Sequence, residues 1–211
     1  MTQTQTRRPT SKTGIKITGR GAYIRQFLAN PFVVGSVAPS SPQLGEEMLR
    51  GLNLGSARAV LEIGPGTGCF TDMILPRLGA NTRFIAIELN EDMARGFRRR
   101  LPQVTLVNES AEHAPSICAR YGIDKVDHVI SGLPWASFPD DLQERLLGAI
   151  QTVLKPGGTF VTFGYHIGTL LKNGKLFYSK LPGRFENVHR SRIVWRNVPP
   201  AFVVRGTQPG G

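Results

Sequence analysis

The residues best suited to chemistry lie in one short stretch, where an acidic side chain precedes three glycines at alternate positions. They are Glu62, Gly64, Gly66 and Gly68. Glycines at this spacing let the backbone of a loop approach a ligand closely. The pattern G-x-G-x-G differs from the dinucleotide fingerprint G-x-G-x-x-G, and the carboxylate of Glu62 would repel a pyrophosphate while it attracts a cationic amine.

A second carboxylate stands at the end of the next apolar run. Residues 84–87 lead into Glu88, which comes 20 residues after Gly68. In nucleotide-binding α/β folds an acid at this place accepts hydrogen bonds from the ribose hydroxyls. The loop and the two carboxylates therefore predict a site for a nucleoside that carries a positive charge. The alternative is a strand-loop-helix unit whose glycines serve packing alone.

The stretch from Glu62 to Gly68, together with Glu88, resembles the cofactor half of the class I S-adenosylmethionine-dependent methyltransferases over about residues 55–165. The resemblance implies that S-adenosylmethionine is the co-substrate and is bound by these residues. Ser110-Ala111 stands where many relatives place Asp-Ala against the adenine, so a contact is implied there as well. Ser131 completes the set of expected cofactor-binding residues.

The elements that must position these residues alternate between strands and helices, which argues for a parallel sheet with covered faces. Strands are expected at 59–63, 83–88, 103–107, 126–130 and 159–164, and helices at 42–51, 68–78, 90–100, 115–121 and 140–154. A loop from 168 to 183 and a hairpin of residues 193–195 and 202–204 should follow. With the resemblance, the fold class is α/β, a Rossmann-like, seven-stranded, mostly parallel sheet with an antiparallel C-terminal hairpin.

The strand expected at 126–130 leads into Ser131-Gly132-Leu133-Pro134-Trp135, at the sheet edge where α/β enzymes bind substrate. Amine methyltransferases often carry Asn or Asp, then Leu-Pro or Pro-Pro and an aromatic residue here, which orient the target nitrogen toward the methyl group. Ser131 or Gly132 replaces the Asn or Asp, so nucleobase methylation is disfavoured. Ser131, Gly132 and Leu133 are the catalytic candidates. A plain turn with a packing Trp135 is the alternative.

Two further catalytic candidates, Tyr165 and His166, follow the strand expected at 159–164. A primary ammonium must lose a proton before its nitrogen can attack, and His166 could accept that proton. The ring of Tyr165 could instead face a cationic substrate. A structural role for both residues is the alternative.

Three motifs resemble a narrower family. They are Asn30 to Ser41, Ser131 to Trp135 with Phe138-Pro139, and Val194 to Ala201. They are similar to the bacterial phospholipid N-methyltransferases of the soluble, rhizobial type, which convert phosphatidylethanolamine to its mono-, di- and trimethyl forms. The resemblance implies an aminolipid N-methyltransferase acting on phosphatidylethanolamine, with ornithine lipid as the alternative substrate. The sequence does not determine the number of methyl groups added.

Charge is distributed unevenly along the chain, whose formal net charge is +11. Residues 1–45 hold six basic residues and no acidic one, residues 46–171 hold 12 basic and 14 acidic residues, and residues from 172 onward hold eight basic residues and one acidic. Cationic ends on a nearly neutral middle indicate an anionic partner, either a membrane surface or nucleic acid.

Residues 1–45 are predicted to form a basic flexible arm and an amphipathic segment, and residues 46–211 the methyltransferase domain. Apolar residues at helical spacing beside cations suit a helix that lies in an anionic membrane surface. The expected membrane-binding residues are Arg20, Tyr23, Ile24, Arg25, Phe27 and Leu28. A lid that closes over the domain is the alternative, and the two roles are compatible.

Other features limit location and chemistry. No window approaches the roughly 18 apolar residues of a spanning helix, and no signal peptide is apparent. Two cysteines and scattered histidines offer no metal-ligand spacing, so no metal is expected. A cytoplasmic protein, peripheral on the inner face of the cytoplasmic membrane, is the resulting prediction.

Two other functions stay open. The Leu-Pro-aromatic loop and the basic ends fit an rRNA adenine N6-dimethyltransferase, but the loop lacks the Asn of those enzymes, so nucleic acid is the less favoured partner. A binding module with a vestigial cofactor fold is the other. The oligomeric state is not predicted.

Overall fold

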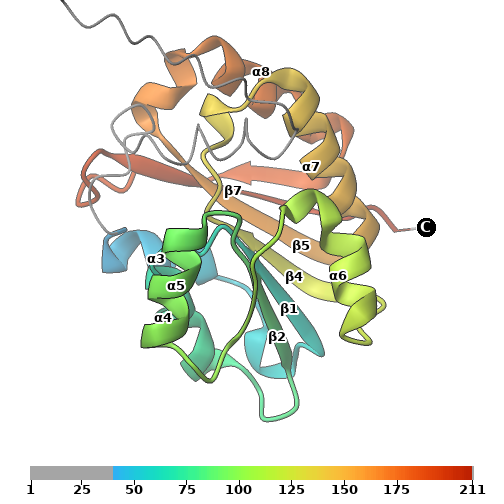
Figure 1. Cartoon of the computed structure of the whole chain (residues 1–211). Helices are drawn as coiled ribbons and strands as arrows, with labels where there is room; N and C mark the ends of the chain where they lie inside the picture. The colour runs from blue at the N-terminus through green and yellow to red at the C-terminus, as the bar shows by residue number, and fades with distance from the viewer. Residues whose placement is uncertain (1–39, 211) are drawn as a thin grey trace, which may run out of the picture.

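The computed structural model of the chain describes residues 40–210, so the membrane-binding residues expected at positions 20–28 lie outside it. Strands and helices alternate from Ala59 to Tyr165, as their periodicity predicts. Figure 1 shows one twisted sheet with helices on both of its faces. None of the helices between residues 40 and 210 combines the length and the apolar character that a membrane crossing requires.

The sheet has seven strands in the order β3-β2-β1-β4-β5-β7-β6. The strands are β1 (Ala59–Ile63), β2 (Arg83–Ile87), β3 (Thr105–Val107), β4 (Val126–Ser131), β5 (Leu154–Tyr165), β6 (Glu186–Arg190) and β7 (Ala201–Thr207). The first five pair in parallel, and β7 runs antiparallel to both β5 and β6. The predicted Rossmann-like sheet with an antiparallel C-terminal hairpin is confirmed. The carboxyl ends of β1, β2, β4 and β5 therefore meet at one edge.

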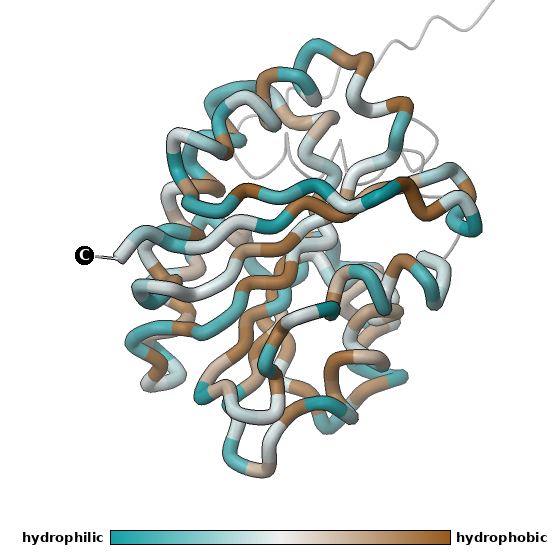
Figure 2. The backbone as a smooth tube through the Cα atoms, turned by 180° about the vertical axis from the view of Figure 1, so that it is seen from behind, coloured by the Kyte–Doolittle hydropathy of each residue, from teal (hydrophilic) through white to brown (hydrophobic). Residues whose placement is uncertain are grey.

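Two groups of helices cover the sheet. The described α-helices are α3 (Pro42–Leu49), α4 (Cys69–Ile74), α5 (Glu91–Arg100), α6 (Ala114–Arg120), α7 (Asp140–Val153) and α8 (Lys172–Lys180). Helices α3 and α4 pack with Val60, Ile130 and Val161, whereas α6, α7 and α8 pack with Leu61, Val129 and Phe160. Successive strand residues face opposite sides, so a strand buried on both faces is mostly apolar. Figure 2 shows this as brown colour along the central strands.

The first described residues lie beside the loop that precedes β7. Ser41 caps α3, since its hydroxyl accepts a hydrogen bond from the Leu44 amide at 3.2 Å, and Pro42 takes the first helical position. The amide of Ser41 donates to Oδ1 of the buried Asn197 at 2.9 Å. This bond joins the two ends of the described chain across the sequence.

Helix α8 occupies the segment for which the sequence predicted a loop. Its glycine and asparagine have low helix propensity, but burial of Phe177 against the core outweighs that preference. The ring of Phe177 stacks on Trp135 with centroids 4.5 Å apart. Helix α8 thereby packs against the loop that follows β4.

The first strand of the C-terminal hairpin was also predicted in the wrong place. It is β6 (Glu186–Arg190), whereas residues 193–195 contribute a single bridge between Val194 and Ala201. Four of the five residues of β6 are exposed, so hydropathy does not mark this edge strand. Strand β5 also starts earlier than predicted, at Leu154 instead of residue 159, and its pairing with β4 is irregular there.

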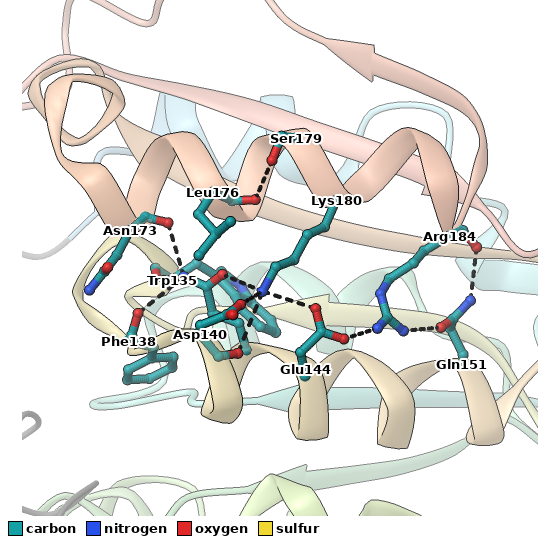
Figure 3. A network of polar contacts seen from close by, with 11 residues as sticks. Trp135, Phe138, Asp140, Glu144, Gln151, Asn173, Leu176, Ser179, Lys180 and Arg184 are labelled. Atoms are coloured by element: carbon teal, nitrogen blue, oxygen red, sulfur yellow. Dashed lines mark hydrogen bonds and ion pairs between the residues drawn. The ribbon is translucent and has the colours of Figure 1, made fainter.

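Gln143 of α7 ties the loop after β4 to α8. Its side chain is fully buried, and its Nε2 donates to the carbonyls of Trp135 at 3.0 Å, Phe138 at 3.1 Å and Asn173 at 3.0 Å. Lys180 of α8 donates to Oε1 of Gln143 at 3.3 Å and also pairs with Asp140 and Glu144 of α7. Figure 3 shows these contacts spanning the two helices.

We expect Gln143→Leu to lower the free energy of unfolding by about 2–4 kcal/mol, because two buried carbonyls and the partly buried carbonyl of Asn173 would lose their donor. Gln151→Leu, on the same helix, is the matched control. Gln151 is only half-buried and shares its bonds with Arg184 at 2.8 Å, so its loss should cost about 1 kcal/mol. Urea unfolding measures both, and equal losses would contradict the buried role of Gln143.

Candidate active site

The loop after β1 adopts a conformation that requires its glycines. Gly64, Gly66 and Gly68 have φ values of 67°, 57° and 85°, which residues other than glycine rarely adopt. The amide of Gly64 donates to the carbonyl of Ile87 at 2.8 Å, and this bond joins the loop to the end of β2. The loop backbone is therefore fixed at the carboxyl edge of the sheet and carries no side chain at its three glycine positions.

This loop contacts the loop that follows β4. A Cβ at Gly132 would lie 2.4 Å from the carbonyl oxygen of Gly64, and one at Gly64 would lie 2.7 Å from the side chain of Leu133. The amide of Gly132 donates to the carbonyl of Ile63 at 2.8 Å. The structure thus brings the predicted cofactor loop and the predicted substrate loop into direct contact.

Glu62 is completely buried at the end of β1. Its Oε2 accepts a hydrogen bond from the hydroxyl of Thr71 at 2.6 Å, but its Oε1 has no partner in residues 40–210. Burial raises the pKa of Glu62 to about 8. A buried acceptor without a donor, directly before a glycine loop, fits the cationic amine of S-adenosylmethionine.

Glu88 follows β2 and is 4% exposed. Its Oε2 accepts from the Gly66 amide at 3.0 Å and its Oε1 from the Asn90 amide at 2.8 Å. Burial raises the pKa of Glu88 above its ordinary value, against the effect of these hydrogen bonds. Each carboxylate oxygen keeps a further lone pair, so the group fits the predicted ribose contact.

A pocket lies between these loops and the end of β3. Its lining includes Gly64, Glu88, Leu89, Ser110, Ala111 and Leu133. Ser110 has a local role as well, because its hydroxyl accepts from the Glu112 amide at 3.3 Å and so caps the short 3-10 helix Ala111–His113. The pocket therefore joins four of the predicted cofactor residues to one residue of the predicted substrate loop.

The side chain of Ser131 forms hydrogen bonds within the predicted substrate loop. Its hydroxyl is buried and accepts hydrogen bonds from the Leu133 amide at 3.3 Å and from Nε1 of Trp135 at 3.1 Å. Trp135 is itself buried against Phe177. The hydroxyl therefore already accepts two hydrogen bonds from within its own loop. A direct role for Ser131 toward cofactor or substrate stays a prediction.

Tyr165 and His166 lie further along the same edge, outside the lining of that pocket. Tyr165 ends β5, half-buried, with its ring edge-on to Phe163 at 5.6 Å between centroids. His166 is exposed and its amide donates to the carbonyl of Pro200 at 2.8 Å. Proton transfer by either residue stays a prediction.

Arg100 contacts the glycine loop, although the sequence did not single it out as a site residue. From the end of α5 its guanidinium donates to the carbonyl of Thr67, at 2.9 Å for Nε, and pairs with Asp72. It also covers Gly68, where a Cβ would lie 2.4 Å from Nη2. No local pattern links it to the glycine loop, which lies more than 30 residues earlier.

We expect Arg100→Ala to weaken S-adenosylmethionine binding about 3- to 10-fold, which is the effect of one or two partly exposed hydrogen bonds. Arg99→Ala is the matched control. Arg99 is exposed on the same helix and donates only to the Arg95 carbonyl at 3.4 Å, so binding should not change. Calorimetric titration compares them, and equal affinities in both variants would contradict a loop-holding role.

Within residues 40–210, no group of three or more His, Cys, Asp or Glu side chains is placed to hold a metal ion. The described histidines are separate, and Cys118 is buried while Cys69 is half-buried.

Comparison with known proteins agrees with the fold. The family described as "Methyltransferase domain" matches residues 60–158. An ornithine lipid N-methyltransferase from Singulisphaera acidiphila is 32% identical over 191 residues, which cover 88% of this chain and 95% of that protein.

Solved structures share the fold at lower identity. The O-methyltransferase TomG from Streptomyces achromogenes, in complex with S-adenosylmethionine, has a TM-score of 0.63 and 18% identity over 90% of both chains. TrmN from Thermus thermophilus has a TM-score of 0.62 and 19% identity over 85% of this chain, which spans only 53% of TrmN. These likenesses concern the fold alone.

The sheet order, the glycine loop and the two acids define a Rossmann-like methyltransferase. The chain belongs to the class I S-adenosylmethionine-dependent methyltransferases, a family in which S-adenosylmethionine is the methyl donor.

Proposed function

We propose that this enzyme methylates the head-group amine of an aminolipid, with ornithine lipid as the first candidate acceptor. The observation that carries the proposal is the similarity, over nearly the whole of both chains, to a protein named as an ornithine lipid N-methyltransferase. Phosphatidylethanolamine, which the sequence motifs favoured, becomes the second candidate. Both lipids present an amine on an acyl-bearing body.

On the cofactor side, the proposal assigns binding of S-adenosylmethionine to the acids and glycines of the loop and to the end of β3. The residues are Glu62, Gly64, Gly66, Gly68, Glu88, Ser110 and Ala111. The unpaired Oε1 of Glu62 supports an ion pair with the methionine amine, and the fixed carboxylate of Glu88 supports contacts to the ribose. When bound, the cofactor supplies an electrophilic methyl group.

On the acceptor side, backbone carbonyls of the loop from Ser131 to Leu133 would orient the amine, so that its nitrogen lone pair meets the methyl carbon. The contact between Gly132 and Gly64 supports this role, because it fixes the spacing between the two loops. Before transfer the ammonium must lose a proton, for which the exposed His166 is the proposed acceptor. Tyr165 is the proposed contact for the cationic head group.

The proposal includes a peripheral position on the anionic inner face of the cytoplasmic membrane. Its support is the charge distribution, with six basic residues and no acidic one in residues 1–45. The basic arm of residues 1–45, with Arg20, Tyr23, Ile24, Arg25, Phe27 and Leu28, would contact the membrane, and residues 46–211 would form the catalytic domain.

The test offers the purified full chain ornithine lipid and phosphatidylethanolamine, each at the same concentration in one nonionic detergent, with methyl-tritiated S-adenosylmethionine. Ribosomal RNA is a third acceptor. We expect label on ornithine lipid at a rate at least tenfold above the other two. Glu88→Ala should lose the label on every acceptor, which shows that the transfer depends on this site.

The outcomes separate the candidates. Label on phosphatidylethanolamine alone would keep an aminolipid enzyme and reassign the head group. If the enzyme binds S-adenosylmethionine but labels neither lipid, the aminolipid proposal fails, and label on RNA would replace it.

A further inference from the structure

Large apolar side chains are exposed at one end of the sheet. Five of the seven such side chains among the described residues are Ile167, Leu170, Leu171, Trp195 and Val198, which are 50–74% exposed. We call this set the docking face. The other two, Met93 and Tyr121, lie elsewhere in the fold. Exposed apolar side chains gathered in two short segments mark an interaction surface.

The two segments of the docking face lie side by side. The first is the 3-10 helix η5 (His166–Leu170), which directly follows β5, together with Leu171 after it, and the second is the loop that precedes β7. Tyr165 pairs with Ala201 across the two strands, and the His166 amide donates to the Pro200 carbonyl at 2.8 Å. In Figure 1 the turn between β6 and β7 projects at the left, beyond the end of the sheet.

The docking face adjoins the predicted substrate loop. A Cβ at Gly168 of η5 would lie 3.4 Å from the Cβ of Ala136, the neighbour of Trp135. Gly174 of α8 packs against Gly168 of η5, because a Cβ at Gly174 would lie 2.1 Å from the Gly168 carbonyl oxygen. A ligand on the docking face is therefore beside the loop that follows β4.

Cations surround the docking face. Lys172, Lys175, Arg192 and Arg196 are exposed, and none of the four forms an ion pair within residues 40–210. From residue 167 to residue 200 the chain contains seven basic residues and one acidic residue, Glu186. An apolar centre with a tryptophan and a cationic rim fits a lipid interface with anionic head groups.

Charge also argues against other occupants. A second copy of the chain, related by two-fold symmetry, would bring the same four cations against these four. Residues 1–39 carry six basic residues and no acidic one, so they too would meet like charge at this rim.

We propose that the docking face inserts into an anionic lipid bilayer and turns the carboxyl edge of the sheet toward the head groups. This inference rests on the proposed function, which requires a lipid acceptor. It gives the membrane contact a place in the folded domain, separate from residues 20–28. The head-group amine then reaches the loop after β4 from the bilayer side.

Intrinsic fluorescence of the full chain tests the proposal, because Trp195 is exposed and the other tryptophan, Trp135, is buried and 2% exposed. The probes are vesicles of equal parts phosphatidylglycerol and phosphatidylcholine with brominated acyl chains. They contain no lipid with a primary amine, so no acceptor for methyl transfer is present. We expect Trp195 emission to shift to the blue and to be quenched, and vesicles of phosphatidylcholine alone to give little change. Trp195→Phe should lose the response.

A paired variant measures the energy of insertion. Leu170→Ser with Val198→Ser should weaken vesicle affinity at least tenfold, whereas Tyr121→Ser, an exposed aromatic residue outside the face, should leave it unchanged. Thermal unfolding by circular dichroism shows that each variant is folded. The double variant should still methylate detergent-dispersed lipid, so loss of docking and failure of the proposed function are distinguishable.

Three results would overturn the proposal. The first is sedimentation of the chain with vesicles while Trp195 stays unquenched, and the second is wild-type vesicle affinity in the double variant. The third is blue emission without vesicles that does not change on their addition. Such emission that is independent of protein concentration would mean that residues 1–39 cover the docking face. Emission that depends on protein concentration would mean that a second copy of the chain covers the docking face.

Discussion

Glu62→Gln should weaken S-adenosylmethionine binding about 10- to 100-fold, which corresponds to the loss of one charge-assisted hydrogen bond. Gln keeps an acceptor for the Thr71 hydroxyl, so the local structure should survive. The variant loses the charge that the proposal pairs with the methionine amine. Calorimetric titration gives both affinities, and an unchanged dissociation constant would remove Glu62 from the site.

Proton release is a sharper readout of the same residue. Because burial raises the pKa of Glu62 to about 8, the carboxyl is protonated in the free enzyme at pH 6.5, and pairing with a cation should ionise it. The wild type should therefore release close to one proton per S-adenosylmethionine bound, whereas Glu62→Gln should release none. Titrations in two buffers of different ionisation enthalpy measure the number, and equal release by both proteins would contradict the pairing.

Stability without cofactor should depend on pH through the same group. The pKa in the folded chain, about 8, is above its ordinary value of 4.5, so between these values the folded state binds more protons than the unfolded one. The contribution of Glu62 to stability is then fully present below about pH 4.5 and is lost as pH rises toward 8. The difference in unfolding free energy between Glu62→Gln and the wild type should therefore increase over this range.

Gly132→Ala should reduce the rate of methyl transfer about 100-fold or more. The added Cβ would lie 2.4 Å from the backbone carbonyl of Gly64, so one of the two loops must move. A displacement of about 1 Å between reacting groups can cost a factor of about 100 in rate. Overpacking should also lower the free energy of unfolding by about 1–3 kcal/mol.

Gly148→Ala is the control for this substitution. Gly148 lies within α7 and a Cβ there would meet nothing within 4 Å, so the variant should keep its activity and gain up to about 1 kcal/mol of stability. Steady-state rates and urea unfolding compare the two variants. If Gly132→Ala keeps activity within a few-fold of wild type, the contact between the loops does not set the geometry of transfer.

Much of the fold was predictable because the elements near the site have strong local patterns. Strand β1 is apolar apart from Glu62 and ends at a glycine loop, so its bounds were predicted from residue types alone. The same holds for Glu62 and Glu88, whose places depend on spacing along single elements. The parallel order follows from alternation of strands and helices.

The remaining features depend on contacts between distant residues. Helix α8 is stabilised by burial of Phe177 on Trp135, and β6 pairs at an exposed edge without an apolar pattern. Arg100 reaches the Thr67 carbonyl only because α5 packs beside the loop. The buried bonds of Ser131 likewise depend on Trp135 folding back over the strand end. Local periodicity does not encode such pairings.

The hydrogen bond from the Ser41 amide to Asn197 has a consequence for avidity. It fixes Ser41, near the start of the described chain, to the loop that carries Trp195 and Val198 of the docking face. If the basic arm of residues 1–45 and the docking face both bind the membrane as proposed, each contact makes the other intramolecular, so both act at high effective concentration. Loss of either contact should then shorten the residence time on a vesicle far more than it slows arrival.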